Sequence, residues 1–384
     1  MRVGLLYPNP VPLSPSNWSG TPHGLAGGLR DQGVEVVPIG AKLPPLVHES
    51  VAVLSRIGGK RGAVAERTLV RQVSRTRVLA RRVAELAPTL DAVVAMGLEL
   101  FDLAAVRRQG LPFVTYDDGT LLQMWNNADS DIRQAGFPGA EVRRWFDRQA
   151  ASARAATLCC VSTAWAARSF TTDYGVPADR VRVVGMGHRP RVAVALDRDW
   201  STPRFLFIGV DWERKNGAAV LRAFDLVHQR YPDATLDIVG KHPRIDLPGV
   251  RDHGFLPRED PAAQALLDSL FATSTAFVLP SMFDPSPIAY LEAASAGLPV
   301  IATTEGGAGE LLGDAAISVH PRDDAALVAA MMQLAEPARA RATGARASEF
   351  AATASWSHVA GRVLDTLDPG IPASGLPTRR EESQ

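Results

Sequence analysis

Short apolar runs that alternate with longer segments of helical periodicity constrain the fold of this chain more than any other sequence feature. The runs in the first half are 3–7, 34–39, 92–95, 113–116, 158–162 and 181–184. Those in the second half are 204–208, 235–239, 250–253, 275–279, 300–303 and 316–319. This alternation is typical of parallel sheets whose strands are joined by crossover helices. We therefore predict an α/β protein with two doubly wound domains.

The length of the chain and a break in the pattern indicate where the domains divide. A chain of 384 residues is too long for one ordinary core, and prolines and charges interrupt the alternation between Arg189 and Pro203. We predict an N-terminal domain over 1–190 and a C-terminal domain over 200–345. A helix at about 346–368 is expected to pack back on the first domain, and 369–384 to form a disordered tail. Two such domains would place a ligand in the cleft between the carboxyl ends of their strands.

The overall charge limits which partners are expected, and the lengths of the apolar runs limit which cellular compartment is expected. The 41 basic and 41 acidic side chains give a net charge of zero, so no nucleic-acid partner is expected. The first apolar run is too short for a signal peptide, and no later run approaches the roughly 18 residues of a membrane span. We expect a cytoplasmic protein.

One segment, residues 56–82, is locally basic, with Glu66 as its only acidic residue. Apolar residues interleave at helical spacing, which indicates a basic amphipathic helix. Such a helix could contact an anionic membrane surface at the inner face of the membrane, or an anionic acceptor. It could equally be the solvated face of a domain helix.

The most informative stretch, residues 280–299, reads P-S-M-F-D-P-S-P-I-A-Y-L-E-A-A-S-A-G-L-P and follows a predicted strand. Ser286 and Pro287 offer an N-cap and a first-turn proline for a helix that contains Ile288 and Glu292. A helix start suits an anionic phosphate because free N–H groups and the helix dipole act together there. Glu292 could accept hydrogen bonds from two ribose hydroxyls. The alternative is an ordinary surface helix.

The spacing of two carboxylates in this stretch resembles the E-x7-E signature of the family 4 retaining glycosyltransferases. Asp284, seven intervening residues and Glu292 match it, although Asp stands at the first position where the family has Glu. The resemblance implies the GT-B fold, in which two Rossmann-like domains face a central cleft. It assigns acceptor binding to the domain at 1–190 and nucleotide-sugar donor binding to the domain at 200–345. It also implies that Glu292 binds the nucleotide ribose and that Asp284 contacts hydroxyls of the transferred sugar. The shorter side chain of Asp284 leaves the sugar preference open.

A second match, F-I-G-V-D-W-E-R-K-N-G at 207–217, resembles the family's Gly-Arg and Lys-Gly that hold the donor diphosphate. Lys215 matches the lysine, but Val210 occupies the arginine position, so Arg214 is the candidate for the second cation. Cations are needed because a departing diphosphate builds negative charge that no metal is expected to neutralise. The alternative is a solvated charged turn.

Two further loops follow predicted strands in the first domain. Gly20, in N-W-S-G-T-P-H-G, resembles the family glycine that lies over the donor phosphates, whereas His23 could bind a ligand or cap a helix. In V-T-Y-D-D-G-T, the resemblance places Asp117 near the transferred sugar, with Asp118 as the alternative. A capping turn is the structural alternative, and a metal site is disfavoured because phosphate-binding cations stand elsewhere.

Three residues of the second domain complete the predicted site. Lys241 and Phe255 resemble the family's nucleobase-binding edge, and Glu305 could reach a sugar hydroxyl or lie in an ordinary turn.

The resemblance implies a retaining, hexosyltransferase-like enzyme that passes a sugar from a nucleoside diphosphate sugar to an acceptor hydroxyl. No cofactor or metal is expected, and the sequence does not identify the acceptor. Two alternatives stay open. One is a non-catalytic nucleotide-sugar-binding protein, and the other is a sugar-nucleotide epimerase on the same fold.

Overall fold

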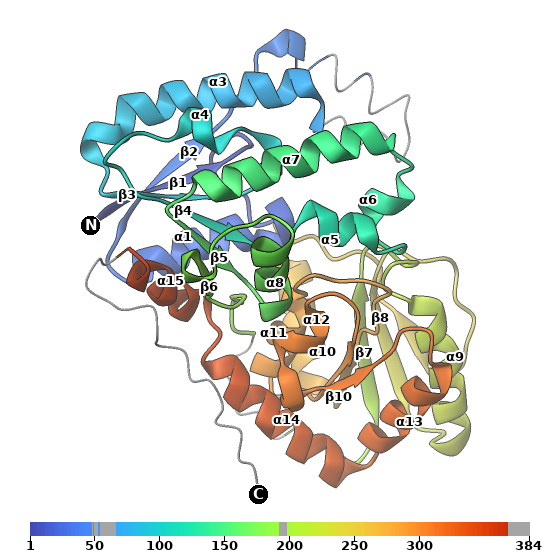
Figure 1. Ribbon diagram of the computed structural model, residues 1–384. Helices are drawn as coiled ribbons and strands as arrows, with labels where there is room; N and C mark the ends of the chain where they lie inside the picture. The colour runs from blue at the N-terminus through green and yellow to red at the C-terminus, as the bar shows by residue number, and fades with distance from the viewer. Residues whose placement is uncertain (48, 50–52, 54–66, 192–197, 368–384) are drawn as a thin grey trace, which may run out of the picture.

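The computed structural model describes residues 1–47, 49, 53, 67–191 and 198–367. It contains two parallel six-stranded sheets, one in each half of the chain, with orders β2-β1-β3-β4-β5-β6 and β12-β11-β10-β7-β8-β9 (Figure 1). The first sheet consists of β1 (Arg2–Tyr7), β2 (Glu35–Gly40), β3 (Ala92–Ala95), β4 (Phe113–Asp117), β5 (Leu158–Val161) and β6 (Val181–Val183). The second consists of β7 (Arg204–Gly209), β8 (Thr235–Gly240), β9 (Val250–Asp252), β10 (Ala276–Val278), β11 (Val300–Thr303) and β12 (Ile317–Val319). Every predicted strand is present, and its ends agree within one residue.

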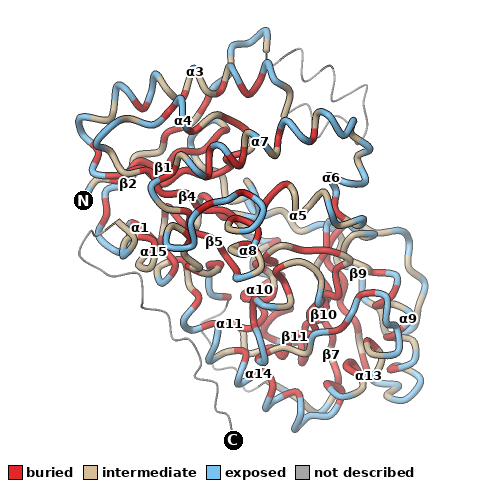
Figure 2. Tube along the Cα trace, in the orientation of Figure 1, coloured by how far each residue is buried: buried red, intermediate tan, exposed pale blue. Residues whose placement is uncertain are grey.

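Helices cover both sheets, and the inner strands of the sheets are buried (Figure 2). The first domain has α1 (Thr21–Asp31), α3 (Leu69–Leu86), α4 (Leu103–Val106), α5 (Leu121–Asn126), α6 (Asp131–Gln134), α7 (Gly139–Ala155) and α8 (Ala164–Thr172). The second has α9 (Gly217–Arg230), α10 (Pro261–Thr273), α11 (Ile288–Ser295), α12 (Ala308–Leu311), α13 (Asp324–Ala335) and α14 (Pro337–Ala352). Parallel strands covered on both faces read as continuous apolar runs, as in β3, where all four residues are buried.

The end of the described chain returns to the first domain. Where the sequence predicts one helix over about 346–368, the structure has two, α14 on the second domain and α15 (Trp356–Asp365) beside α1 (Figure 1). Glycines allow this close approach, because a Cβ at Gly28 would lie 2.1 Å from the carbonyl oxygen of Trp356. The predicted tail 369–384 lies outside the described residues.

The chain crosses from one domain to the other twice. The two crossing segments, which we call the two passages, are hydrogen-bonded to each other at His188. The backbone N–H of His188 donates to the carbonyl of Ala354 at 3.2 Å, and the N–H of Trp356 donates to the carbonyl of His188 at 3.3 Å. A parallel bridge pairs His188 with Ser355. His188 and residues 354–356 therefore form a single contact between the two passages, which we call the interdomain joint.

A second set of contacts joins the domains on the side of α8. The hydroxyls of Ser162 and Ser286 are 2.5 Å apart. Glu310 accepts a hydrogen bond from the backbone N–H of Trp165 at 2.6 Å and pairs with Arg168. The structure is thus a closed arrangement of the two domains.

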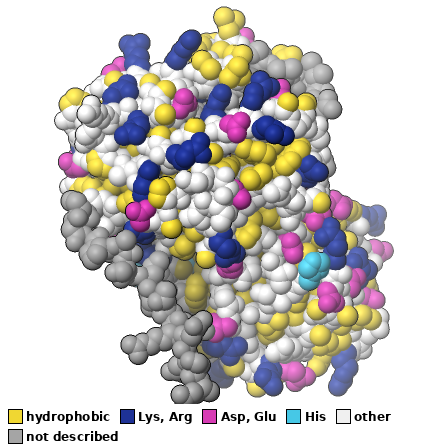
Figure 3. Space-filling view, viewed as in Figure 1, with side chains coloured by type: hydrophobic (Ala, Val, Ile, Leu, Met, Phe, Trp, Pro, Cys, Tyr) yellow, Lys and Arg dark blue, Asp and Glu magenta, His cyan; other side chains and the backbone are white. Residues whose placement is uncertain are grey.

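Helix α3 presents its arginines differently from the outward basic face that the sequence suggests. Arg71 and Arg75 are buried, and Arg75 donates to the carbonyl of Pro8 at 3.1 Å. Leu69 and Val70 are exposed instead. Lysine and arginine side chains are scattered over the upper domain in Figure 3 rather than gathered in one dense patch. Residues 56–66 of the predicted basic segment lie outside the described part of the chain.

None of the helices in the described ranges combines the length and the apolar character that crossing a bilayer requires.

Candidate functional site

Two adjoining cavities lie between the domains. The central cavity, about 600 Å³, is lined by residues that follow strands, such as Gly97 after β3, Asp118 after β4 and Lys215 after β7. The hinge cavity, about 740 Å³, lies beside the two passages and is lined by His188 and Ser355. Ser19, Arg258 and Ile288 line both cavities. Both sheets therefore turn polar groups toward one interdomain site, as the sequence predicts.

The loop between β7 and α9 brings two cations to Asp284 in the central cavity. The Lys215 ammonium donates to the Asp284 carboxylate, and Arg214 Nη1 lies 3.5 Å from the same oxygen. Burial lowers the pKa of Lys215, while the nearby Asp284 carboxylate opposes that shift. Asn216 holds the loop in place, since its side-chain amide donates to the carbonyl of Pro321 at 2.7 Å. Three predicted site residues are thus brought together.

Glu292, the other carboxylate of the motif, lines the hinge cavity and is 5% exposed. Its Oε1 lies 3.3 Å from Arg191 Nη2 and 4.0 Å from Arg258 Nη1. Arg191 is also bonded to Gln264 and Asp268, each at 3.0 Å. The carboxylate is therefore held at the cavity wall by two arginines.

The start of α11 differs from the predicted cap. Pro287 is the N-cap residue and Ile288 the first helical residue, so the prediction that Ser286 caps the helix is wrong. The Ser286 hydroxyl instead contacts Ser162 and the carbonyl of Pro285. All three residues, Ser286, Pro287 and Ile288, still line the central cavity.

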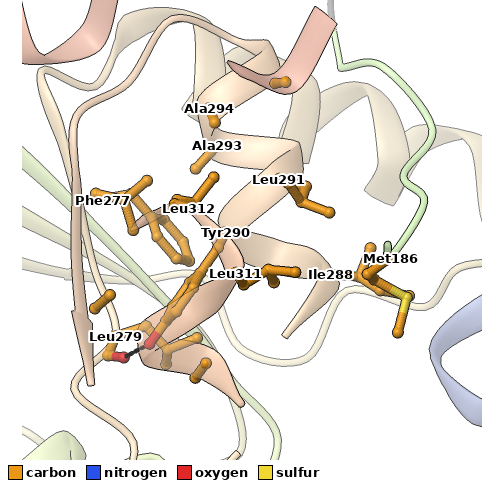
Figure 4. Packing of buried hydrophobic residues seen from close by; sticks show 14 of the residues in the cluster. Met186, Phe277, Leu279, Ile288, Tyr290, Leu291, Ala293, Ala294, Leu311 and Leu312 are labelled. Carbon is orange, nitrogen blue, oxygen red and sulfur yellow. Dashed lines mark hydrogen bonds between the residues drawn. The ribbon is translucent and has the colours of Figure 1, made fainter. Parts of the chain in front are cut away.

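Packing behind α11 fixes its position relative to the second sheet. The Tyr290 hydroxyl donates to the carbonyl of Leu279 at 2.7 Å and accepts from the N–H of Thr303 at 2.9 Å. Figure 4 shows this bond and, on the opposite side of the helix, Met186 of the first domain near Ile288. The helix that carries Glu292 is therefore anchored to the ends of β10 and β11.

Three carboxyl side chains from the first domain line the central cavity. Asp117 is 8% exposed, and among the described residues its Oδ2 has no hydrogen-bond partner. Burial, Glu99 and Asp118 raise its pKa well above the usual range. Burial, Asp284 and Glu99 raise the pKa of Asp118 to about 6. Burial and neighbouring carboxylates thus favour the protonated form of Asp117, whereas Asp118, with a pKa of about 6, is ionised at neutral pH.

The loop after β1 enters both cavities through a strained turn. Trp18 and Ser19 have φ of 47° and 56°, and Gly20 has φ of 89°. Left-handed conformations at non-glycine residues are costly and persist where the surroundings enforce them. Gly20 and the exposed His23 line the hinge cavity, whereas Trp18 lines the central cavity.

Three predicted residues are not brought to the lining of either cavity. The Lys241 ammonium lies 5.5 Å from the centre of the Phe255 ring, and 51% of Phe255 is exposed. Glu305 lies 3.7 Å from His320. Their assigned contacts with the base and the sugar stay predictions.

Among the cavity residues that sequence reasoning missed are Trp18, Glu99, Arg191 and Arg258. Glu99 follows the predicted strand 92–95 by a few residues, so its place after a strand end was an available signal. Arg191 lies in the interdomain segment, which gives no such signal. Within the described ranges, no group of three or more His, Cys, Asp or Glu side chains is arranged to hold a metal ion.

Comparison with known proteins identifies the family of the second domain. Residues 202–337 match the family described as "Glycosyl transferases group 1". The O-antigen chain mannosyltransferase B of Escherichia coli is 30% identical over 143 residues, which cover 33% of this chain and 35% of that protein. A GDP-mannose-dependent alpha-(1-6)-phosphatidylinositol monomannoside mannosyltransferase of Mycolicibacterium smegmatis is 32% identical over 200 residues, or 47% and 48% of the two chains. The chain thus spans about a third to a half of the length of these curated relatives.

Solved structures resemble the whole chain. Sucrose-phosphate synthase from Thermosynechococcus elongatus superposes with a TM-score of 0.65 at 16% identity, covering 95% of this chain and 98% of that one. WaaG, a glycosyltransferase involved in lipopolysaccharide biosynthesis, gives 0.61 at 17% identity, with 96% and 100% covered. The chain accordingly has the GT-B fold of these structures, and its residues 202–337 match the group 1 glycosyltransferases.

Proposed function

We propose that this protein is a retaining glycosyltransferase that transfers a hexosyl group from a nucleoside diphosphate sugar to an acceptor hydroxyl. The observation that carries this proposal is the pairing of Asp284 with Lys215 and Arg214 in the central cavity, next to Glu292 in the hinge cavity. One continuous site thus offers cations for a diphosphate and carboxylates for sugar hydroxyls.

The diphosphate would lie between the β7–α9 loop and the start of α11. Lys215 and Arg214 would bind its oxygens, releasing part of their hold on Asp284, which then accepts from hydroxyls of the transferred sugar. Gly20, whose added Cβ would lie 2.9 Å from the carbonyl of Pro15, keeps the opposite loop free of side-chain bulk. The charges on the β7–α9 side of the site are therefore suited to an anionic donor.

The nucleoside would occupy the hinge cavity, where Glu292 can accept hydrogen bonds from two ribose hydroxyls. Arg258 lines both cavities, so it stands where the nucleoside joins the diphosphate. Arg191 and Arg258 both approach Oε1 of Glu292, and no hydrogen bond from the described residues reaches Oε2, which would accept from the ribose.

Transfer would proceed on one face of the sugar. The bond between the anomeric carbon and the phosphate oxygen breaks, and its electron pair leaves with the diphosphate. The acceptor hydroxyl oxygen bonds to the anomeric carbon, and its proton moves to the departing phosphate oxygen. Lys215 and Arg214 stabilise the charge that develops on the diphosphate, and the closed domains exclude the water that would otherwise hydrolyse the donor.

A thermal-shift screen against nucleoside diphosphates and nucleotide sugars, with and without chelator, tests the donor site because bound ligand raises the melting temperature. Donor hydrolysis and transfer assays follow with the nucleotide sugar that gives the largest shift. A shift without turnover would support the non-catalytic binding protein, and sugar interconversion without acceptor would support the epimerase. No shift with any nucleotide would refute the donor-site assignment.

A peripheral membrane location is the second part of this proposal, with the enzyme in the cytoplasm at the inner face of the membrane. The exposed Arg77, Arg81 and Arg82 of α3 would meet anionic headgroups, and the exposed Leu69 and Val70 would enter the interface. Co-sedimentation with vesicles that contain phosphatidylglycerol, compared with purely zwitterionic vesicles, tests it. Equal recovery with both vesicles would overturn it.

A further inference from the structure

We propose that the acceptor is a ring polyol bearing a protonated amine, which pairs with Asp118 in the central cavity. The inference rests on the proposed function, since it concerns the second substrate of the same transfer.

The wall that the first domain contributes to the central cavity carries more negative than positive charge. Glu99, Asp117 and Asp118 line it, and Arg67 is the arginine that this wall adds within the described residues. Arg67 Nη2 lies 3.6 Å from Glu99 Oε1, so its charge is already compensated. Within the described ranges, no lysine or arginine of this wall is paired with Asp117 or Asp118.

These two aspartates differ in what they can bind. Asp117 is buried and lines the cavity, and its Oδ2 has no hydrogen-bond partner among the described residues, so this oxygen can exchange a hydrogen bond with a ring hydroxyl. Asp118 is ionised at neutral pH, and the charged neighbours that raise its pKa, Asp284, Glu99 and Asp131, are all acidic. A partly buried carboxylate among acidic neighbours is stabilised by a cationic ligand.

The donor cannot supply this cation. A nucleoside diphosphate sugar is anionic, and its diphosphate would engage Lys215 and Arg214 on the opposite wall. Asp284 also holds Lys215. Lys215 and Arg214 are thus engaged by Asp284 and the diphosphate, so we assign the cation that pairs with Asp118 to the acceptor, and a phosphate on the acceptor at this place would be repelled.

The indole of Trp18 provides a surface against which the ring of the acceptor would stack. Its side chain is 39% exposed, lines the central cavity and meets the edge of Tyr7 at a ring-centre distance of 4.9 Å. A Cβ at Gly97 would lie 2.4 Å from the Trp18 ring, so the glycine creates the space for it. An indole face favours both the apolar face of a ring and a nearby cation.

Binding of matched acceptors in the presence of saturating nucleoside diphosphate tests the inference. The probes are glucosamine, glucose and glucose 6-phosphate, together with streptamine, scyllo-inositol and an inositol monophosphate, measured by calorimetry at pH 7.5. We expect the amine-bearing member of each set to bind about tenfold more tightly than its neutral counterpart, and the phosphate to bind more weakly.

Three variants show whether Asp118 causes the preference. Asp118→Asn should bring the amine and its neutral counterpart within about twofold of each other, while Asp118→Glu should keep the preference. Asp147→Asn is the matched control, because it removes the same charge from an exposed residue of α7 that lines neither cavity. It should leave the preference unchanged.

Equal binding of amine and hydroxyl members, failure of every amine to bind, or a preference that survives in Asp118→Asn would each overturn the inference. Any of these results with intact nucleoside diphosphate binding affects the acceptor inference alone. Failure of the wild-type protein to bind any nucleoside diphosphate would instead overturn the proposed function.

Discussion

Arg191 and Glu292 form an ion pair at 3.3 Å with side-chain exposures of only 10% and 6%. Arg191 lies at one passage between the domains, and Glu292 lies in α11, so the pair connects the interdomain joint to the predicted ribose contact.

Replacing Arg191 with Met should destabilise the protein. The change leaves the Glu292 carboxylate buried with Arg258 at 4.0 Å as its remaining cation, and breaking a buried ion pair costs about 3 kcal/mol. Urea denaturation measures the free energy of unfolding. The double variant Arg191→Met/Glu292→Gln should recover part of the loss, because no unpaired charge is left. A loss in the single variant below about 1 kcal/mol would show that Arg258 or water compensates the carboxylate.

Lys215→Ala and Glu292→Ala should each remove most of the transferase activity while the protein stays folded. Loss of a group that stabilises charge in the transition state lowers kcat by about 100-fold or more, so Lys215→Ala should act mainly on kcat. Glu292→Ala should also weaken donor binding. Steady-state kinetics and circular dichroism check both variants. Lys42→Ala is the control, since Lys42 is exposed and lines neither cavity. Unchanged donor affinity and turnover in both variants would refute the site assignment.

Asp118 should make the ligand-free protein less stable as the pH rises. Its pKa of about 6 in the folded chain lies above the ordinary value of 3.8, so the folded state binds the proton more tightly than the unfolded state. Stability is therefore lost as the pH rises from about 4 through 6. Asp118→Asn should gain about 1 to 2 kcal/mol over the wild type at pH 8 and no advantage at pH 4. Denaturation at both pH values tests this, and equal differences at the two would contradict the raised pKa.

Glu310→Ala should weaken closure of the domains. The Glu310 carboxylate joins α12 to the start of α8 through Trp165 and Arg168, so its loss favours the open arrangement. We expect the donor KM to rise about three- to tenfold, since only a fraction of the protein would then be competent to bind. The ratio of donor hydrolysis to transfer should also increase. Glu349→Ala, which removes an exposed carboxylate on α14, is the matched control. Identical donor KM in the two variants would show that Glu310 does not contribute to closure.

The strands could be predicted because each one is a compact apolar run with its own periodicity. The cap at α11 could not, because the Ser286 hydroxyl contacts Ser162, a residue of the other domain. Local sequence favours serine at a helix start, but this tertiary contact competes for the same hydroxyl.

The position of Glu99 depends on sheet order, which the sequence does not give directly. β3 lies between β1 and β4, so the residues that follow it reach the loops that carry Trp18 and Asp117. Buried arginines in α3 were missed for a related reason. A helical pattern defines the faces of a helix but does not say which face packs on the domain, and Arg71 and Arg75 are on the packed face.

The pairing of His188 with Ser355 has a mechanical consequence for the enzyme. The segments at His188 and at 354–356 are hydrogen-bonded side by side. This contact permits rotation of the domains about a single axis, but it resists sliding of one domain past the other. The hinge cavity borders both segments, so a nucleoside bound there would press directly on the axis of rotation. Binding of the nucleoside in the hinge cavity would then change the angle between the domains before the sugar is transferred to the acceptor.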